Sequence, residues 1–308
     1  MTIRVPKPGL STTIQDLGRY GYAHLGISPA GAGDSLSFRI ANLLVGNEEA
    51  APALEMTLLG ATLEFGAAAV VAITGADCGP KLGSDQVPLN TPFEVPAGAV
   101  LSCGSMTDGA RSYLAVQGGF DVPLIMGSAS TDVRGRFGGF DGRRLQSGDV
   151  LQICDAKTSQ TRALRPGVLD SLRDRAPIRV TRGAQQDWFG PEAFAALFAS
   201  AYTVSDMSDR AGLRLKGDAL RPREHSQLLT DGIPLGAIQV PQDGQPIILF
   251  VDQQTTGGYP KIANVIAADM HRVGQLQPRE EIRFAEVSIA LAIQALREQE
   301  RWLKEIFQ

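Results

Sequence analysis

Short apolar runs, many of them alternating with polar residues, recur along the whole chain. Residues 69–74 (AVVAIT), 111–116 (RSYLAV), 178–180 (IRV) and 246–251 (PIILFV) alternate in polarity or are rich in β-branched residues. Such runs are typical of strands. The chain also holds 34 glycines and 18 prolines, which favour turns between strands. The pattern predicts a mainly β protein.

One local form occurs three times along the chain. Residues 96–102 (PAGAVLS), 147–153 (SGDVLQI) and 278–284 (PREEIRF) each place a tight turn before a short alternating strand. We interpret these strands as closing strands of barrel-like sheets, the third of which ends the second half of the protein. Three weak matches do not indicate a repeat array.

Helical spacing of apolar residues is found in a few segments. Residues 34–45 have this spacing, and Asp34 stands where an N-cap is expected. Residues 191–201 begin with proline and glutamate, as first turns often do. Residues 287–306 have a long amphipathic pattern, which predicts a C-terminal helix that packs on the body of the protein or on a partner.

The segment 155–175 is polar, charged and broken by a Pro-Gly pair, so it is the best candidate for a boundary. We therefore predict two β domains, residues 1–165 and residues 176–308, the second ending in the C-terminal helix. A length of 308 residues agrees with two domains.

Composition narrows the class of protein. The chain is 44% hydrophobic and 20% charged, with a net charge of −4, which gives no reason to expect a nucleic acid or an anionic membrane as partner. No apolar stretch approaches the ~20 residues that span a bilayer, and the first residues lack the apolar segment of a secretion signal. We expect a cytoplasmic protein. Neither a disulfide framework nor a zinc site is expected, because cysteines and histidines are few and scattered. They are Cys78, Cys103, Cys154, His24, His225 and His271.

Two loops near the N-terminus combine glycines with polar side chains. Residues 15–34 (QDLGRYGYAHLGISPAGAGD) contain glycines that let the backbone approach a ligand, beside Arg19, Ser28 and Asp34. Asp77 follows a predicted buried strand, a common place for a carboxylate that faces a ligand. Each stretch taken alone is more often a turn than a site.

Two further loops carry arginines. In residues 117–144, Arg134 and three other arginines alternate with glycines, downstream of Ser128, Ser130 and Thr131. Backbone amides and guanidinium groups bind phosphate or carboxylate, although a solvated basic loop is an equal alternative. In residues 204–215, Ser208 and Arg210 share a turn with an aspartate, where a structural Asp–Arg pair is the more common outcome.

Residues 252–270 (DQQTTGGYPKIANVIAADM) leave an apolar strand through a polar, glycine-containing loop that ends at Lys261. The loop is not a P-loop, because Ile262 stands where the motif needs a hydroxyl. Residues 261–273 fit either a helix or a buried strand. We favour a ligand-binding strand end, because the loop carries more donors than a turn requires. The alternative is a tight turn in which Lys261 pairs with a carboxylate.

Read together, these stretches resemble the biotin-dependent carboxyltransferase-like family, also called the allophanate hydrolase subunit 2 family. The resemblance runs from about residue 6 to residue 284. It rests on these segments: QDLGRYGYAHLGISPAGAGD, ALEMTLLGATLEF, ITGAD, YLAVQGGFDVPLIMGSASTDVR, SDRAGLRLKG and LTDGIPLGAIQVPQDGQPIILFVDQQTTGGYPKIANVIAADM.

The resemblance implies two cyclophilin-like β-barrel domains and a role as one part of a multi-subunit enzyme. The implied activity is that of the C subunit of a 5-oxoprolinase, which opens 5-oxoproline to glutamate at the expense of ATP. The implied partners are the B subunit, which is KipI-like and belongs to the allophanate hydrolase subunit 1 family, and the A subunit, which is LamB/YcsF-like. Which of these proteins binds ATP is left open.

Two other functions are compatible with the same resemblance. One is a regulatory protein that antagonises a KipI-like kinase inhibitor. The other is a carboxyltransferase subunit that acts on urea or a related amide. No Met-Lys pair of the kind that carries biotin occurs in the chain, so any biotin would be attached to another chain.

We hypothesise catalytic roles for Lys261, Asp77 and Arg210. The predicted substrate- or anion-binding residues are Arg19, Ser28, Asp34, Ser128, Ser130, Thr131, Arg134, Ser208, Gln253, Thr255, Thr256, Gly257, Gly258 and Tyr259. The chain departs from the usual family pattern at Ala129, where the family has arginine, and at Gly33 and Ala211, where it often has methionine.

Overall fold

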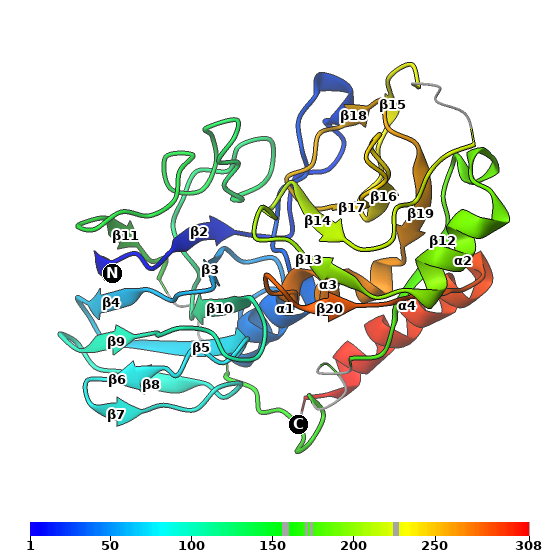
Figure 1. Ribbon diagram of the computed structural model, residues 1–308. Coiled ribbons are helices and arrows are strands. Elements are labelled where there is room, and N and C mark those ends of the chain that lie inside the picture. Colours follow the sequence, from blue (N-terminus) through cyan, green and yellow to red (C-terminus); the bar gives the residue numbers. More distant parts are fainter. Residues whose placement is uncertain (156–159, 170–171, 173–174, 224–227, 308) are drawn as a thin grey trace. The chain divides into compact units, whose positions relative to one another are not determined.

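The computed structural model describes all residues except 156–159, 170–171, 173–174, 224–227 and 308 (Figure 1). The chain forms two compact units. Unit 1 comprises Met1–Tyr20, Ala30–Val168 and Leu303–Gln308, and unit 2 comprises Gly21–Pro29 and Leu169–Trp302. The predicted domain bounds, residues 1–165 and 176–308, stay a prediction. Part of the predicted boundary segment, residues 155–175, lies outside the described residues, and so does His225.

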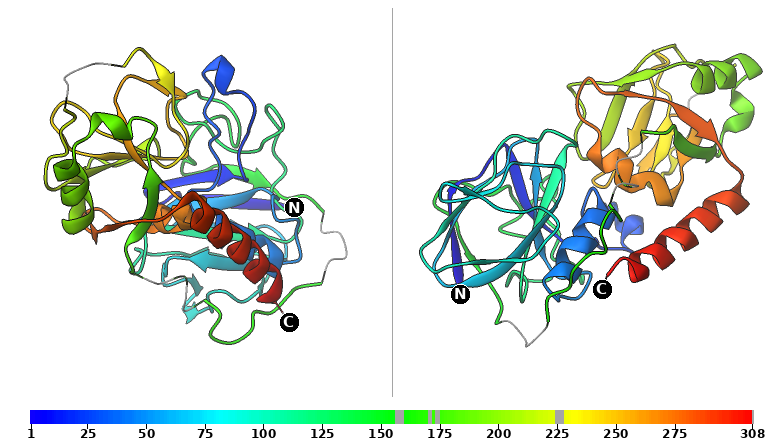
Figure 2. Two further views of the ribbon diagram at one scale, coloured as in Figure 1. Left: turned by 90° about the vertical axis from the view of Figure 1, so that its right-hand side faces the viewer. Right: turned by 90° about the horizontal axis from the view of Figure 1, so that it is seen from below.

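Unit 1 contains two antiparallel sheets, with strand orders β11-β1-β4-β9-β6-β7 and β2-β3-β10-β5-β8. Its strands are β1 Thr2–Lys7, β2 Ser11–Gln15, β3 Ala53–Thr57, β4 Thr62–Phe65, β5 Ala69–Gly75, β6 Lys81–Leu82, β7 Asp85–Gln86, β8 Phe93–Val95, β9 Val100–Ser102, β10 Arg111–Val116 and β11 Val150–Gln152. Helix α1 (Ser35–Leu44) packs against β10 and β5 (Figure 2). This packing buries the apolar face that the sequence pattern predicted.

Unit 2 is built on one sheet of eight strands, in the order β20-β13-β14-β17-β16-β19-β12-β21. Its strands are β12 Ile178–Arg182, β13 Tyr202–Val204, β14 Gly212–Lys216, β16 Ala237–Gln239, β17 Ile247–Leu249, β19 Lys261–Val265, β20 Glu281–Ile282 and β21 Phe284–Glu286. The two edge strands, β20 and β21, are separated by Arg283 alone. The sheet therefore curls into a nearly closed barrel.

Unit 2 also has a two-stranded ribbon, formed by β15 (Asp231–Gly232) and β18 (Thr256–Gly257). Its helices are α2 (Pro191–Ala199), α3 (Met270–Gln275) and α4 (Ile289–Glu305). The last three residues of α4, from Leu303 on, belong to unit 1. Short 3₁₀ helices span Ala23–Leu25, Gln186–Trp188 and Ala267–Asp269. Within the described part of the chain, no helix is long and apolar enough to cross a membrane.

Each unit has its own apolar core. In unit 1, Leu54, Ile73 and Leu114 lie on neighbouring strands and are completely buried. In unit 2, Ile248 and Ile262 are among the completely buried core residues. Burial of an aliphatic side chain of this size contributes about 1.5–3 kcal/mol. These cores fix the positions of the strands that precede and follow the polar loops.

The structure confirms the mainly β fold with few helices. The three predicted closing strands are present as β9, β11 and β20, and the predicted helices are α1, α2 and α4. The ambiguous segment after Lys261 is a strand, β19, followed by a short helical stretch from residue 267. Its pairing with β16 and β12 explains why a strand forms there.

Candidate functional site

The side chain of Lys261 lies at the start of β19 and is nearly inaccessible, with 3% of its surface exposed. Its Nζ lies 2.7 Å from Oδ2 of Asp231 and donates a second hydrogen bond to the carbonyl oxygen of Gly232, at 3.3 Å. Asp231 is in contrast 48% exposed. A buried ammonium group must be paired, and here its partner comes from the ribbon strand β15.

Gln185 is the second donor to the same carboxylate. Its Nε2 lies 3.4 Å from Oδ2 of Asp231, and its Oε1 accepts the backbone N–H of Lys261 at 3.1 Å. Since Oε1 faces that N–H, Nε2 must point to Asp231, which determines the orientation of the amide. The backbone N–H of Gly232 donates to Oδ1 of Asp231 at 2.8 Å. We call these three donors, Lys261 Nζ, Gln185 Nε2 and Gly232 N–H, the cradle.

The cradle changes the acidity of the carboxyl group that it holds. The hydrogen bond from Lys261 is the main cause of a lowered pKa for Asp231, and the N–H of Gly232 lowers this pKa further. Hydrogen bonds to the charged form favour that form. Asp231 is therefore held as a carboxylate.

The ribbon places the predicted loop residues beside the cradle. Asp231 pairs with Gly257, and Gly232 pairs with Thr256, while the carbonyl oxygen of Thr255 accepts the N–H of Ile233. A Cβ on Gly257 would lie 2.7 Å from Cδ1 of Ile233, so a larger residue there would require the Ile233 side chain to move. The side chain of Thr256 is exposed, as is that of Tyr259, whereas Thr255 and Gly258 are half-buried.

Gln253 is buried, and its Nε2 donates to the carbonyl oxygen of Ile233 at 3.0 Å. Its Oε1 is also buried and has no hydrogen-bond partner among the described residues. Gln253, the ribbon and Lys261 thus form one polar group in unit 2. The structure brings Gln253, Thr255, Thr256 and Gly257 together with Lys261, whereas the predicted roles of Gly258 and Tyr259 stay predictions.

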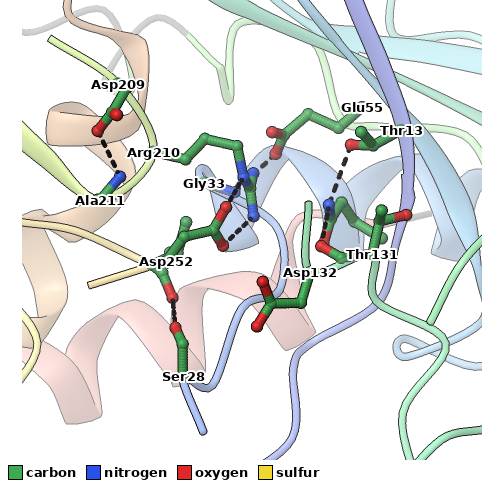
Figure 3. A network of polar contacts seen from close by, with 12 residues as sticks. Thr13, Ser28, Gly33, Glu55, Thr131, Asp132, Asp209, Arg210, Ala211 and Asp252 are labelled. Carbon is green, nitrogen blue, oxygen red and sulfur yellow. Dashed lines mark hydrogen bonds and ion pairs between the residues drawn. The ribbon is translucent and has the colours of Figure 1, made fainter. Parts of the chain in front are cut away.

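The guanidinium group of Arg210 forms an ion pair with the carboxylate of Asp252, the residue that begins this loop (Figure 3). Nε of Arg210 lies 2.8 Å from Oδ2 of Asp252, and Nη2 lies 3.0 Å from Oδ1. The hydroxyl of Ser28 donates to the carbonyl oxygen of Val251 at 2.9 Å. Both contacts hold the start of the loop in place. The two-bond geometry is the strongest form of an arginine–carboxylate pair.

Ser208 has a structural contact within its own turn. Its hydroxyl donates to the carbonyl oxygen of Arg214 and accepts the N–H of the same residue. Oδ1 of Asp209 accepts the N–H groups of Ala211 and Gly212. These hydrogen bonds stabilise a turn in residues 208–212. A ligand-binding role for Ser208 stays a prediction.

In unit 1, the predicted anion-binding hydroxyls surround a carboxylate. Ser128 and Ser130 donate to Oδ1 of Asp16 at 2.7 Å and 2.5 Å, and the N–H of Ala129 donates to Oδ2 at 2.6 Å. The hydroxyl of Thr131 donates to the carbonyl oxygen of Ile14 at 2.8 Å. These hydroxyls stabilise a buried acid. Their predicted role toward a substrate is not tested by this arrangement and stays a prediction.

The two predicted arginines of unit 1 differ in burial. Arg19 is 2% exposed, donates to the carbonyl oxygen of Ser130 and lies 4.8 Å from the centre of the Phe137 ring. Arg134 is exposed. Arg19 therefore contacts Ser130, the residue whose hydroxyl binds Asp16, whereas Arg134 faces solvent.

Asp34 and Asp77 lie at turns of unit 1. Asp34 caps helix α1, because its Oδ1 accepts the N–H groups of Leu36 and Ser37. Oδ1 of Asp77 accepts the N–H of Gly79 at 2.8 Å. Both contacts are those of capping or turn residues. Their proposed binding and catalytic roles stay predictions.

Asp34 also adjoins a buried acid that sequence reasoning did not find. The Tyr113 hydroxyl donates to Oε2 of Glu55 at 2.8 Å and accepts the N–H of Asp34, while the N–H of Gly33 donates to the same carboxylate oxygen. Burial, followed by the charge of Glu55, raises the pKa of Tyr113 well above its usual value. Tyr113 therefore acts as a hydrogen-bond donor to Glu55.

Sequence reasoning also missed Gln185, Asp231 and Asp252 as members of the polar group in unit 2. The only signal for Asp231 was the Asp-Gly pair in TDGIP, which reads as a turn. Among the described residues, no group of three His, Cys, Asp or Glu side chains is arranged to hold a metal ion.

Comparison with known proteins gives one family and relatives of more than one kind. Residues 25–286 match the family described as carboxyltransferase domain, subdomain A and B. The chain is 40% identical over 304 residues to the C subunit of 5-oxoprolinase from Escherichia coli (strain K12), covering 99% of this chain and 97% of that protein. It is 34% identical over 307 residues to the urea amidolyase of Saccharomyces cerevisiae, covering 93% of this chain and only 17% of that protein.

Among solved structures, the K. lactis urea amidolyase superposes with a TM-score of 0.94 at 34% identity, covering 99% of this chain and 20% of that chain. The match to so small a part of a long protein indicates that the fold of this chain also occurs as one segment of larger enzymes.

Proposed function

This chain belongs to the carboxyltransferase domain family, subdomains A and B, and we propose that it acts as the C subunit of an ATP-dependent 5-oxoprolinase. The observation that carries the proposal is the end-to-end match to the C subunit of a 5-oxoprolinase. A match over the full length of both proteins supports the same role more strongly than a match to one segment of a larger enzyme.

The reaction opens a five-membered lactam. The bond between the ring nitrogen and the carbonyl carbon breaks, and one water supplies a hydroxyl to the carbon and a proton to the nitrogen. A second water is consumed as ATP is hydrolysed to ADP and phosphate. The product is glutamate. Both substrate and product carry a carboxylate, so the complex needs a cation that holds an anionic group in place.

The polar group in unit 2 supports this role. Lys261 supplies the positive charge, and Gln253 presents a buried amide oxygen beside the ribbon. In this proposal Lys261 binds an anionic group of the substrate. Arg210 holds Asp252, and through it the loop that carries Gln253.

The loop before Lys261 does not fit the phosphates of ATP. A phosphate-binding loop uses glycines to turn several N–H groups toward the anion. Gly257 is instead extended and paired with Asp231 in the ribbon, and the lysine is paired with the same aspartate. We therefore propose that the complex uses ATP and that this loop does not bind its phosphates.

The proposal includes the companion proteins that a C subunit implies. These are a KipI-like B subunit and a LamB/YcsF-like A subunit, and the complex is cytoplasmic. This chain is proposed to take part in hydrolysis only within the assembly of all three.

A second candidate function is carboxyl transfer to urea or a related amide. The match to urea amidolyases favours it, in sequence and in structure. Carboxybiotin would then arrive on another chain. Both candidates require an anionic group and an amide to be held, so the same residues serve either reaction.

The test is reconstitution of this chain with its own KipI-like and LamB/YcsF-like partners. We expect glutamate to form from 5-oxoproline only when ATP and all three chains are present. An assembled, stable complex that forms no glutamate would contradict the proposal. Carboxylation of urea by this chain together with a carboxybiotin donor would then favour the second candidate.

A further inference from the structure

The cradle holds a carboxylate that belongs to the protein itself. Two donors, Lys261 Nζ and Gln185 Nε2, converge on Oδ2 of Asp231 at 2.7 Å and 3.4 Å. A third donor, the N–H of Gly232, reaches Oδ1. Converging donors of this kind form a binding site for a carboxylate of any origin.

The donors are fixed, whereas the carboxylate is exposed. Lys261 and Gln185 as whole residues are 2% and 9% exposed. The backbone N–H of Gln185 donates to the carbonyl oxygen of Lys261, and the backbone N–H of Lys261 donates to the side-chain Oε1 of Gln185. Asp231 lies on a strand of two residues and its side chain is 48% exposed. Rotation of one exposed side chain would therefore open the cradle without disturbing the buried donors.

The exchange of one carboxylate for another requires little net energy. An ion pair with an exposed partner is worth little, because water solvates the exposed group well in either position. A carboxylate from a ligand would restore every hydrogen bond that Asp231 gives up. Without an anion, the buried ammonium of Lys261 would lose its charged partner, so the cradle favours one carboxylate at a time.

From this geometry we propose that the cradle is the binding site for the carboxylate of the lactam substrate, and that Asp231 occupies it as an internal competitor until substrate binds. The inference rests on the proposed function, because it takes 5-oxoproline as the substrate. It adds that Gln185 is a specificity-determining residue and that the carboxylate, rather than the lactam group, is what Lys261 recognises.

The test compares two ligands that differ only in the carboxylate. Binding of 5-oxoproline and of 2-pyrrolidinone, the same lactam ring without a carboxylate, is measured by titration calorimetry on the assembled complex without ATP. The proteins are the wild type, Asp231→Asn, Lys261→Met and, as a control, Asp206→Asn. The control removes an exposed carboxylate that pairs with Arg279 elsewhere in unit 2.

Asp231→Asn should tighten binding of 5-oxoproline roughly threefold to tenfold, because it removes the competing charge. Lys261→Met should weaken the same binding roughly tenfold or more, because a charge-assisted hydrogen bond is lost. Neither substitution should change the binding of 2-pyrrolidinone by more than about twofold, and Asp206→Asn should affect neither ligand.

The inference is overturned if Asp231→Asn leaves the binding of 5-oxoproline unchanged or weakens it, if both ligands respond alike, or if the wild-type complex does not bind 5-oxoproline. Failure of the proposed function is distinguishable. A complex that turns over 5-oxoproline while Asp231→Asn has no effect on binding contradicts this inference alone. A complex that shows the expected binding differences but forms no glutamate with ATP contradicts the proposed function alone.

Discussion

The ammonium group of Lys261 is buried, yet the carboxylate that lies 2.7 Å away belongs to Asp231, whose side chain is 48% exposed. The buried ammonium group must be paired with an anion, whereas the exposed carboxylate is well solvated in either position. In the inference proposed above, this asymmetry in exposure lets a substrate carboxylate replace Asp231. This relationship connects the structure of the β15–β18 ribbon to the proposed binding of a substrate carboxylate.

The acidity of Asp231 should depend on Lys261. The hydrogen bond from Lys261 is the largest cause of the lowered pKa of Asp231, so in Lys261→Met this pKa should rise toward the ordinary value of about 3.9. Because the folded-state pKa is the lower one, the stabilisation is present above the unfolded-state pKa. It is lost as the pH falls through the folded-state pKa. Carbon-13 NMR titration of aspartate carboxyl groups, with Asp231→Asn used to identify the signal, measures both values. Equal pKa values in the two proteins would show that Lys261 does not hold this carboxylate.

Arg210 and Asp252 should be strongly coupled in stability. Arg210→Met leaves the carboxylate of Asp252, which is 5% exposed, without its two hydrogen bonds from arginine. We expect a loss of about 3 kcal/mol in the free energy of unfolding. The double variant Arg210→Met/Asp252→Asn should lose much less than the sum of the two single variants. Urea denaturation of the four proteins measures the coupling, and additive losses would contradict it.

Asp34 should contribute to stability as a helix cap. Asp34→Ala removes the acceptor of the N–H groups of Leu36 and Ser37 at the start of α1. The free energy of unfolding should fall by about 1–2 kcal/mol. Asp34→Asn keeps an oxygen acceptor and is the matched control, with a smaller expected loss. If the alanine and asparagine variants were equally stable in urea denaturation, the capping contacts would not account for this residue.

The two glycines of the ribbon should respond differently to alanine. A Cβ on Gly257 would lie 2.7 Å from Cδ1 of Ile233, whereas a Cβ on Gly232 would meet no atom within 4 Å. We expect Gly257→Ala to lower the free energy of unfolding by about 1 kcal/mol, the low end of the range for overpacking, because the atom met is the movable Cδ1 of the Ile233 side chain. Gly232→Ala should change it by no more than about 0.5 kcal/mol. Thermal and urea unfolding of both variants check this, and equal effects would mean that the ribbon tolerates a side chain at residue 257.

Features set by nearby residues could be predicted from the sequence. Helix α1 and its cap at Asp34 follow from local spacing, and the short strands β9, β11 and β20 follow from turns beside alternating residues. Periodicity did not decide whether the segment after Lys261 is a helix or a strand, because both bury its apolar residues. Pairing of β19 with β16 and β12 decides for the strand, and that pairing joins distant parts of the chain.

The contacts of the candidate site could not be predicted for the same reason. Lys261 was identified from its loop, but its partner Asp231 lies 30 residues away and Gln185 lies 76 residues away. Ser128 and Ser130 were recognised as hydrogen-bonding residues, yet the acceptor of their hydroxyls, Asp16, is 112 and 114 residues distant. A pattern of residue types indicates that donors are present, and only the fold determines which acceptors they reach.

The most direct measurement is glutamate formation from 5-oxoproline by the assembled complex that contains Lys261→Met. The control is Lys216→Met, which removes an exposed lysine from β14 of the same unit. We predict that Lys261→Met lowers kcat/KM for 5-oxoproline roughly tenfold to a hundredfold, mainly through a higher KM, because a charge-assisted contact to the substrate is lost. Lys216→Met should leave kcat/KM unchanged. A correctly assembled Lys261→Met complex with the kcat/KM of the wild type would contradict the account.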